Sequence, residues 1–301
     1  MKKKIIIAII VIALIVSSFT TGYFIAKSKY KDNTPNVKEE LENSNQEQDN
    51  EEQENEEPTE DEPKDEMPTE DEEEKLIPDI ISIKYEKETY TTRNKKGVKI
   101  TESTRNIPEI KFSSNQKAAD KIEQSLIEIS DNEWNSNIKF TANELKDAEH
   151  LESLKDYEGL GATLNFTNHQ ISKQIITFEL LLEGGFGGVG WYGFWGYSYD
   201  ITTGELLTLK SLTNNYNKLE KILLTEIKKE LEKLKREFEI YEMSDQQIIE
   251  YINKTGNWVL TEQGISVIFQ EYEISDGATG AIKIDIAKSK INNCLKEEYK
   301  Y

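Results

Sequence analysis

The chain has 301 residues and a formal net charge of −20 at pH 7, from 37 basic and 57 acidic side chains. Its single cysteine, Cys294, excludes an intramolecular disulfide and a zinc site of the Cys₄ or Cys₂His₂ type. We expect no nucleic-acid partner, because a polyanion repels phosphate and gains nothing from counterion release. With about 100–200 residues per domain, the length allows one or two domains.

The negative charge is concentrated in one segment. Residues 1–37 carry six Lys and one Asp, whereas residues 38–75 carry 20 acidic side chains and three Lys. Residues 76–301 carry 28 basic and 36 acidic side chains. The extreme acidity therefore belongs mainly to residues 38–75, and the remainder of the chain is only mildly acidic.

Residues 5–26 form an uncharged apolar run of 22 residues, with three Lys just before it and three Lys just after it. A helix that spans a bilayer needs about 20 residues, and basic residues mark the cytoplasmic side. We therefore predict a single-pass anchor in the cell membrane, in contact with the lipid bilayer through residues 5–26. Residues 1–4 would be a cytoplasmic stub, and the rest would lie outside the cell. The alternative is a cleaved signal peptide, although the run is longer than the usual signal core.

Residues 27–75 are predicted to be a disordered acidic linker. Within them, residues 38–75 hold almost no apolar side chains and three Pro. Such a segment cannot bury enough surface to offset its ordering entropy, and its like charges extend it. The linker would then be either a spacer that lifts a domain off the membrane or a solubilising tether without a partner. It lacks the Gly and the ordered spacing of a calcium-binding loop.

A small α+β unit is expected over residues 76–150. Residues 80–91 and 98–107 have strand-like patterns around a turn at 93–97. Ser113 or Ser114 would cap a helix, and a second helix is expected over about 142–151. The apolar stripe of the first helix is Ala118, Ala119, Ile122, Leu126 and Ile129.

A second α+β unit is expected over residues 151–301. It would begin with a hairpin that turns at Asn168-His169, and a long helix capped by Thr213 or Asn214 would run to about Phe238. Ser244 would cap a shorter helix. The remaining expected strands are 161–167, 171–183, 191–199, 258–260, 265–269 and 282–286, with a helix at the C-terminus. The fold class is therefore α+β, with antiparallel sheets and helices packed on one face, after an N-terminal transmembrane helix and the disordered acidic linker.

Residues 184–200 contain seven Gly and seven aromatic residues. In a strand, Trp191, Trp195, Tyr197 and Tyr199 would point to one face, and Tyr192 and Phe194 to the other. Two interpretations remain open. The strand is either buried on both faces, or it presents an aromatic surface that stacks on sugar rings or anchors a protein partner, centred on the loop 184–190.

The sequence offers no catalytic machinery. Gly185, Gly187 and Gly190 match a dinucleotide-binding pattern, but an aromatic strand follows them instead of the helix that such a site needs. His150 and His169 have no acidic partner at the spacing of a triad or metal site, and no Gly-x-Ser-x-Gly elbow occurs. We therefore assign no catalytic residue, no metal and no cofactor.

Three stretches together resemble a bacterial extracytoplasmic family. They are residues 106–110 with the helix that follows, residues 183–209 with a Gly-Gly turn, an aromatic strand and an Asp-x-x-Thr-Gly hairpin, and residues 258–280. The family is a paired domain of unknown function, found outside the membrane in lysozyme-sensing anti-sigma factors of the RsiV type. It also precedes the catalytic domain in peptidoglycan deacetylases of the PdaC type. The resemblance covers about residues 79–295.

The chain departs from that family in two ways. Members often carry a His in the Gly-rich loop, whereas residues 184–188 read Gly-Gly-Phe-Gly-Gly. Four residues before the apolar run are too few for a sigma-binding segment, so we expect no anti-sigma activity. Any role that the family's His has in this loop is likewise not expected in this chain.

The resemblance implies a membrane-anchored extracytoplasmic binding module. Its ligand would be a lysozyme-like cationic protein or a cell-wall glycan such as peptidoglycan, and the acidic charge favours the protein through electrostatic steering. Alternatives are a cell-wall-acting enzyme, an accessory domain of one, or a structural surface protein without a specific ligand. The candidate ligand-binding residues are Gly185, Phe186, Trp191, Tyr192, Trp195, Tyr272 and Glu273.

Overall fold

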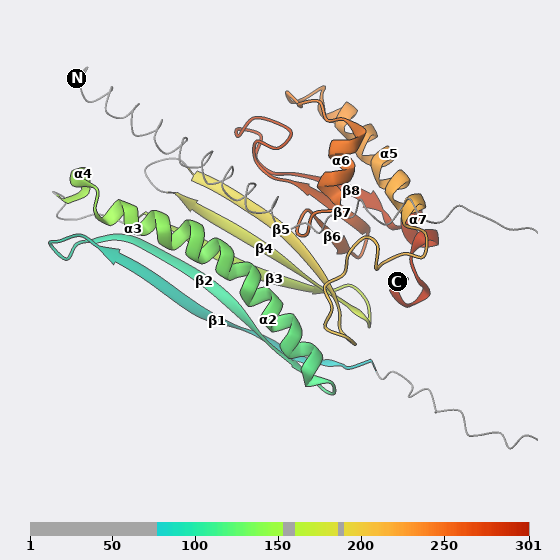
Figure 1. Ribbon diagram of the computed structural model, residues 1–301, viewed down its shortest axis with the longest axis horizontal. Coiled ribbons are helices and arrows are strands. Elements are labelled where there is room, and N and C mark those ends of the chain that lie inside the picture. Colours follow the sequence, from blue (N-terminus) through green and yellow to red (C-terminus); the bar gives the residue numbers. More distant parts are fainter. Residues whose placement is uncertain (1–76, 153–159, 186–189, 301) are drawn as a thin grey trace, which may run out of the picture. The chain divides into compact units, whose positions relative to one another are not determined.

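The computed structural model describes residues 77–152, 160–185 and 190–300 (Figure 1). The expected stub, membrane run and acidic linker lie outside these residues, as does Phe186. In the ranges that the model describes, no helix is both long enough and apolar enough to cross a membrane.

The first sheet has five strands in the order of the sequence, β1-β2-β3-β4-β5. Neighbouring strands are antiparallel, except that β2 and β3 pair in parallel at Thr104–Thr163 and Arg105–Leu164. This sheet therefore takes strands from both sides of residue 150, and the division expected there stays a prediction. The strands are β1 (Ile80–Arg93), β2 (Lys99–Phe112), β3 (Gly161–Gln170), β4 (Ile175–Gly185) and β5 (Gly190–Asp200).

Helix α2 (Gln116–Glu133) packs against β2 on one face of this sheet (Figure 1). Its predicted apolar stripe is confirmed, because Ala118, Ala119, Ile122 and Leu126 are buried and Ile129 packs against the same core. A π-helical turn η1 (Trp134–Lys139) continues α2 into α3 (Phe140–Lys146), and α4 (Glu149–Glu152) follows. The core beneath α2 includes Phe178, Leu180, Tyr197 and Tyr199.

The second sheet has three antiparallel strands in the order β6-β7-β8. Helix α5 (Tyr216–Leu234) contacts β8 and α6, and its buried side chains are Leu219, Leu223, Ile227 and Leu231. The α+β class with mainly antiparallel sheets is therefore confirmed. The other elements are β6 (Trp258–Thr261), β7 (Gly264–Phe269), β8 (Ile282–Ala287), α6 (Asp245–Ile252), α7 (Lys288–Ile291), η2 (Asn292–Cys294) and η3 (Glu297–Tyr299).

Ser244 caps α6 as predicted, with a full capping box to Gln247, whereas the two other expected caps are wrong. Asn115, with a left-handed φ of 54°, precedes α2 in place of Ser113 or Ser114. Asn215 caps α5 by accepting the Lys218 N–H at 3.1 Å. Thr213 lies two residues before this cap, and its hydroxyl donates to the backbone carbonyl of Cys294 and accepts the Asn215 N–H at 2.9 Å.

Three predicted element boundaries are also corrected. Asn168 and His169 pair with Phe178 and Thr177 inside the hairpin, and the turn lies at 171–174. The Ser172 hydroxyl holds this turn by accepting the N–H groups of Gln174 and Ile175, each at 3.2 Å. The helix expected over 142–151 is divided into α3 and α4, and α5 ends at Leu234, not near Phe238.

Candidate functional site

The outer edge of β5 is tied to the segment that follows β7. The side-chain amide of Gln270 behaves there like a strand backbone: its Oε1 accepts the Phe194 N–H at 2.9 Å, and its Nε2 donates to the Phe194 carbonyl. The amide therefore satisfies two backbone groups that an edge strand would otherwise leave unpaired.

The next residue makes a second connection to the same edge. The Glu271 carboxylate accepts a hydrogen bond from the backbone N–H of Tyr192. Burial raises the pKa of Glu271, and the hydrogen bond from Tyr192 opposes that shift without cancelling it. Two successive side chains thus hold residues 270–273 against the beginning of β5.

Tyr272 has an unusual backbone conformation. Its φ is 65°, in the left-handed region that residues other than Gly rarely adopt. Its ring lies over Gly277, where an added Cβ would be 2.2 Å from the ring. The glycine therefore provides the space that the ring occupies, and the backbone of Tyr272 is held in a conformation that it would not choose alone.

Tyr192 and Tyr272 are exposed aromatic residues on these two connected segments. Their exposed fractions are 54% and 70%, which is high for large side chains. Glu273 is exposed and Glu271 is partly exposed beside them. We call these four residues the aromatic surface. They unite Tyr192 from the predicted aromatic strand with Tyr272 and Glu273 from the predicted loop.

The other candidates from the sequence have different surroundings. Gly185 ends β4 opposite Gly190, and Trp195 is partly buried against the core beneath α2, with its ring filling the space above Gly193. Phe186 and the side chain of Trp191 lie outside the described part of the structure. Tyr197 and Tyr199 face the core as the two-residue period predicts.

Phe194 lies on the opposite face from Trp195 and is covered by a cation. The Lys283 ammonium lies 3.5 Å from the centre of its ring and 3.3 Å from a carboxylate oxygen of Glu179. Phe194 therefore belongs to the contact between the two sheets.

Gln270 and Glu271, whose side chains connect the two segments of the aromatic surface, were not candidates from the sequence. Only their position just before Tyr272 could have indicated them.

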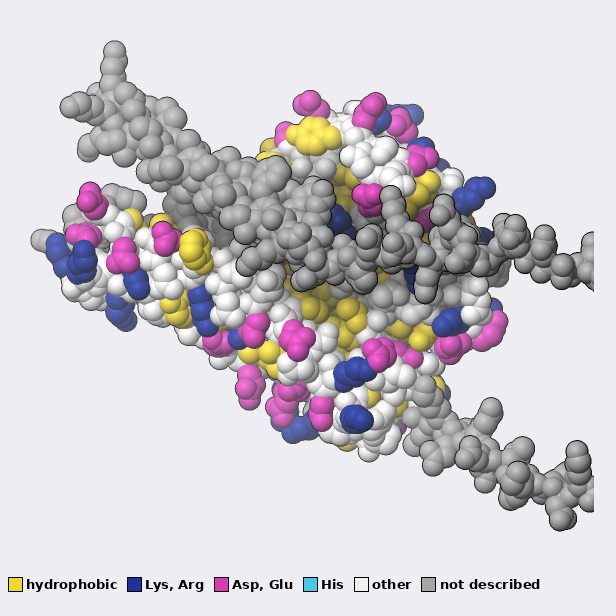
Figure 2. Space-filling view, viewed as in Figure 1, with side chains coloured by type: hydrophobic (Ala, Val, Ile, Leu, Met, Phe, Trp, Pro, Cys, Tyr) yellow, Lys and Arg dark blue, Asp and Glu magenta, His cyan; other side chains and the backbone are white. Residues whose placement is uncertain are grey.

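Charges on the described surface are mixed. On the face shown in Figure 2, acidic and basic side chains are interspersed, without a separate patch of one sign. In the described ranges, no group of three or more His, Cys, Asp or Glu side chains could hold a metal ion.

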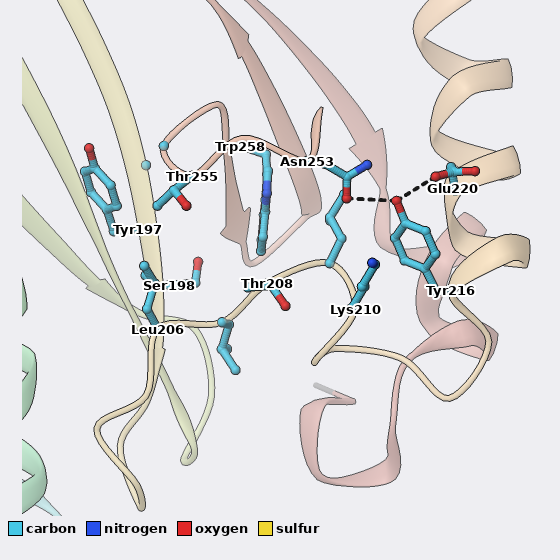
Figure 3. A pocket seen from close by; sticks show the side chains of 14 residues that line it. Tyr197, Ser198, Leu206, Thr208, Lys210, Tyr216, Glu220, Asn253, Thr255 and Trp258 are labelled. Carbon is cyan, nitrogen blue, oxygen red and sulfur yellow. Dashed lines mark hydrogen bonds between the residues drawn. The ribbon is translucent and has the colours of Figure 1, made fainter. Parts of the chain in front are cut away.

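A hollow of about 460 Å³ lies farther along the outer edge of β5. Its lining comes from β5, residues 206–210, the first turns of α5, residues 253–256 and β6 (Figure 3). These residues are distant along the chain and form no motif, so the sequence does not indicate the hollow. The lining is Gly196, Tyr197, Ser198, Leu206, Leu207, Thr208, Leu209, Lys210, Tyr216, Glu220, Asn253, Thr255, Gly256 and Trp258.

Residues 210–289 match the model of a family described as a protein of unknown function, DUF3298. The match covers α5, α6 and the three-stranded sheet. A comparison with curated proteins found no match. The findings therefore support a domain of the DUF3298 type in this part of the chain.

Solved structures of the same family resemble the chain over a longer range. A DUF3298 family member from Bacteroides fragilis shares 15% identity and a TM-score of 0.54, over 73% of this chain and 95% of its own. A family member from Pseudomonas aeruginosa shares 14% identity and a TM-score of 0.45, over 74% of this chain and 97% of its own. At this identity, the first likeness shows a shared fold alone.

Proposed function

We propose that this chain is an extracytoplasmic binding module, anchored in the membrane by residues 5–26 and carried on the acidic linker. We further propose that it binds its ligand on the aromatic surface. The observation that carries this proposal is the pair of exposed rings, Tyr192 and Tyr272, on two segments connected by the side chains of Gln270 and Glu271.

The aromatic surface has the properties of a binding anchor. Tyr is one of the residue types that contribute most to protein interfaces, because its large ring loses little conformational entropy when it is buried. The left-handed backbone and the space over Gly277 hold Tyr272 in one position before any ligand arrives. Such preorganisation reduces the ordering cost of binding.

The charge around Tyr272 favours a cationic protein over a neutral glycan. Glu271 and Glu273 flank the ring in the sequence, and the exposed Asp276 follows in the next turn. The basic side chain near Phe194, Lys283, already pairs with Glu179. We therefore propose a cationic protein of the lysozyme kind as the ligand, in keeping with the resemblance to lysozyme-sensing anti-sigma factors.

The test is a titration of the fragment 77–301 with a c-type lysozyme, at low salt and at about 0.15 M salt, where exposed charges are screened beyond roughly 8 Å. We expect micromolar or tighter binding that persists at the higher salt. Tyr272→Ala and Tyr192→Ala should each weaken binding by about tenfold or more, as expected of interface anchors.

Phe140→Ala is the matched control, because Phe140 is a similarly exposed aromatic residue, at 59%, on α3. It should leave the affinity unchanged. Binding that disappears at the higher salt, or that is equal in all three variants, would contradict the proposal. Binding of soluble peptidoglycan fragments instead of lysozyme would keep the surface as the site but make the ligand a glycan.

A further inference from the structure

The hollow along β5 is separate from the aromatic surface. It lies beside Gly196 and Ser198, whereas the aromatic surface lies at Tyr192, near the opposite end of the strand. Leu206, Leu207 and Gly256 line it, and all three are bonded to the edge of β5. Its volume of 460 Å³ is within the range of roughly 300–1,000 Å³ that is usual for small-molecule sites.

Trp258 contributes an indole N–H to the wall of the hollow. The residue is only 6% exposed, and no hydrogen bond of its indole N–H is found within the described ranges. The fully enclosed polar side-chain atoms without partners are Ser114 Oγ, Ser266 Oγ and Asn292 Oδ1, so the indole nitrogen is not fully enclosed. Trp258 is one of the residues that line the hollow (Figure 3).

Lys210 supplies a positive charge to the same hollow. Its ammonium lies 5.4 Å from the centre of the Tyr216 ring, and no described carboxylate lies within ion-pair distance of it. Figure 3 shows Lys210, Tyr216 and Asn253 together on one side of the indole of Trp258. Both the ammonium and the indole N–H are donors that cannot accept a hydrogen bond. The ligand must therefore present acceptor atoms.

The carboxylate in the hollow is already engaged. The Tyr216 hydroxyl lies 2.6 Å from Glu220 Oε2 and 2.8 Å from Asn253 Oδ1. Burial and the neighbouring Glu220 raise the pKa of Tyr216, so its hydroxyl keeps its proton at neutral pH and can donate it to Glu220. Glu220 is thus bonded within the wall of the hollow, and among the described residues it forms no ion pair with Lys210.

We propose that this hollow binds a small organic acid, with its carboxylate held by the Trp258 N–H and the Lys210 ammonium. One cation and one neutral donor match one negative charge with several acceptor sites. Leu206, Leu207 and the Tyr216 ring would contact the apolar body of the acid. A doubly charged phosphate would place excess negative charge beside Glu220. The proposal does not depend on the function proposed for the aromatic surface.

The test uses the full chain labelled with 5-fluorotryptophan. The sequence has four Trp, so four ¹⁹F signals are expected, and Trp258→Phe identifies the one from Trp258. Benzoate and glucuronate are added at constant ionic strength and compared with their uncharged counterparts, benzyl alcohol and glucose. At least one acid should shift the Trp258 signal saturably, and its counterpart should not.

Lys210→Met should weaken this binding by about tenfold or more, because it removes the charge and keeps most of the aliphatic chain. Its three other ¹⁹F signals report whether the variant is folded. Lys117→Met, at an exposed lysine of α2, is the matched control and should bind the acid normally.

Three results would overturn the proposal. They are a Trp258 signal that does not move with either acid, a Trp258 signal that moves equally with the uncharged compounds, and a Lys210→Met variant that binds as tightly as the parent chain. A shift with inorganic phosphate alone would likewise show that the carboxylate class is wrong. Because none of these results involves lysozyme or the tyrosines of the aromatic surface, failure here is distinguishable from failure of the proposed function.

Discussion

Asp200 closes the turn after β5 and is buried. Its Oδ1 accepts the Thr202 N–H at 2.7 Å, the Thr202 hydroxyl at 2.5 Å and the Thr203 N–H at 3.2 Å. Its Oδ2 accepts Gln174 Nε2 at 3.1 Å and the Tyr299 hydroxyl at 3.0 Å. The Asp-x-x-Thr-Gly motif therefore has a structural role, because it links the β3–β4 turn, the end of β5 and the C-terminal segment.

Gly204 completes this motif because no other residue fits its position. Its φ is 70°, and its N–H donates to the Asp200 carbonyl at 2.8 Å. An added Cβ would lie 2.5 Å from the carbonyl oxygen of Ala118 in α2. Both the left-handed conformation and the contact with α2 therefore require glycine.

The first prediction concerns Asp200→Asn. Burial alone would raise the pKa of Asp200, but the hydrogen bonds from Thr202, Gln174 and Tyr299 outweigh it and hold the pKa below its usual value. A lowered carboxyl pKa contributes stability that is present above the unfolded pKa of about 3.9 and is lost as pH falls through the folded pKa. The Asn side chain would place an NH₂ donor against Gln174 Nε2, so we expect a loss of about 2 kcal/mol at pH 7.

Urea unfolding of both proteins between pH 2 and pH 7 checks this expectation. The difference in unfolding free energy should be largest above pH 5 and should decrease as the pH falls below about 4. A difference that is constant over the whole range would show that the charge of Asp200 does not contribute.

For single residues, the sequence predicts the face of the strand to which a side chain points better than it predicts whether that side chain is exposed to solvent. The two-residue period correctly places Tyr197 and Tyr199 on one face, where α2 covers them. It could not show that Lys283 covers Phe194 while Tyr192 stays exposed, because the covering residues come from a distant segment. The left-handed conformation of Tyr272 was also unpredictable, since local energetics favour Gly or Asn there.

Strand β5 is an edge strand whose outer side is nearly covered. Leu207 donates to the Ser198 carbonyl at 2.7 Å, and Gly196 donates to the Gly256 carbonyl at 3.0 Å. Farther along, the Gln270 amide pairs with Phe194 and the Glu271 carboxylate accepts the Tyr192 N–H. An uncovered edge would be open to pairing with another chain, so these contacts protect β5 while they shape the hollow and the aromatic surface.

Gln270→Ala should destabilise the fold by about 1–3 kcal/mol, because it leaves two backbone groups of Phe194 without their partners. Urea unfolding should show a lower midpoint with an unchanged slope. Gln246→Ala is the control, since that exposed side chain bonds only Glu250, on its own helix, at 3.0 Å. Equal midpoints for the two variants would mean that water replaces the Gln270 amide without loss.

Most strands and helices could be predicted from hydrophobic periodicity, but Pro108 misled the prediction for β2. We expected the strand to end at residue 107, just before Pro108, and it continues to Phe112. On the side of Pro108 that faces away from β1, the N–H groups of Ile110 and Phe112 bond to Glu123 and Gln116 of α2. Proline has no N–H, but an N–H at position 108 would point to that same side, where no β3 residue pairs with it. The hydrogen-bonded ladder between β2 and β1 is therefore intact.

The two sheets are joined by contacts between residues that are far apart in the sequence. The Thr177 hydroxyl donates to the Leu260 carbonyl at 3.2 Å, and Leu260 N–H donates to the Ser198 hydroxyl at 3.1 Å. Nearby, a Cβ added at Gly196 would lie 2.3 Å from Cβ of Val259. No local pattern could predict such contacts, because they depend on how β6 meets β4 and β5. They should make the sheets stabilise each other.

Arg105, on β2, connects β1 with α2. Its guanidinium is buried and pairs with Glu88 at 2.6 Å and with Asp131 at 2.5 Å, and it lies 5.2 Å from the Trp134 ring. Removing it leaves the partly buried Glu88 without its main cation. Because both acids are partly exposed, we take a loss on the order of 2 kcal/mol, below the usual figure for a fully buried pair.

Variants at Gly196 and Arg105 test whether residues 77–300 unfold as one unit or as two units that divide near residue 150. Gly196→Ala should destabilise the contact between the sheets by about 1–3 kcal/mol through overpacking, and Arg105→Met should destabilise the region of α2. With 5-fluorotryptophan labelling, Trp134 reports on the first expected unit and Trp258 on the second. If the shared sheet couples them, each variant lowers the urea midpoints of both signals equally, as all-or-none unfolding requires. If Arg105→Met lowers the Trp134 midpoint and leaves the Trp258 midpoint in place, the expected division is real, and the parallel pairing of β2 with β3 is too weak to make the halves cooperative.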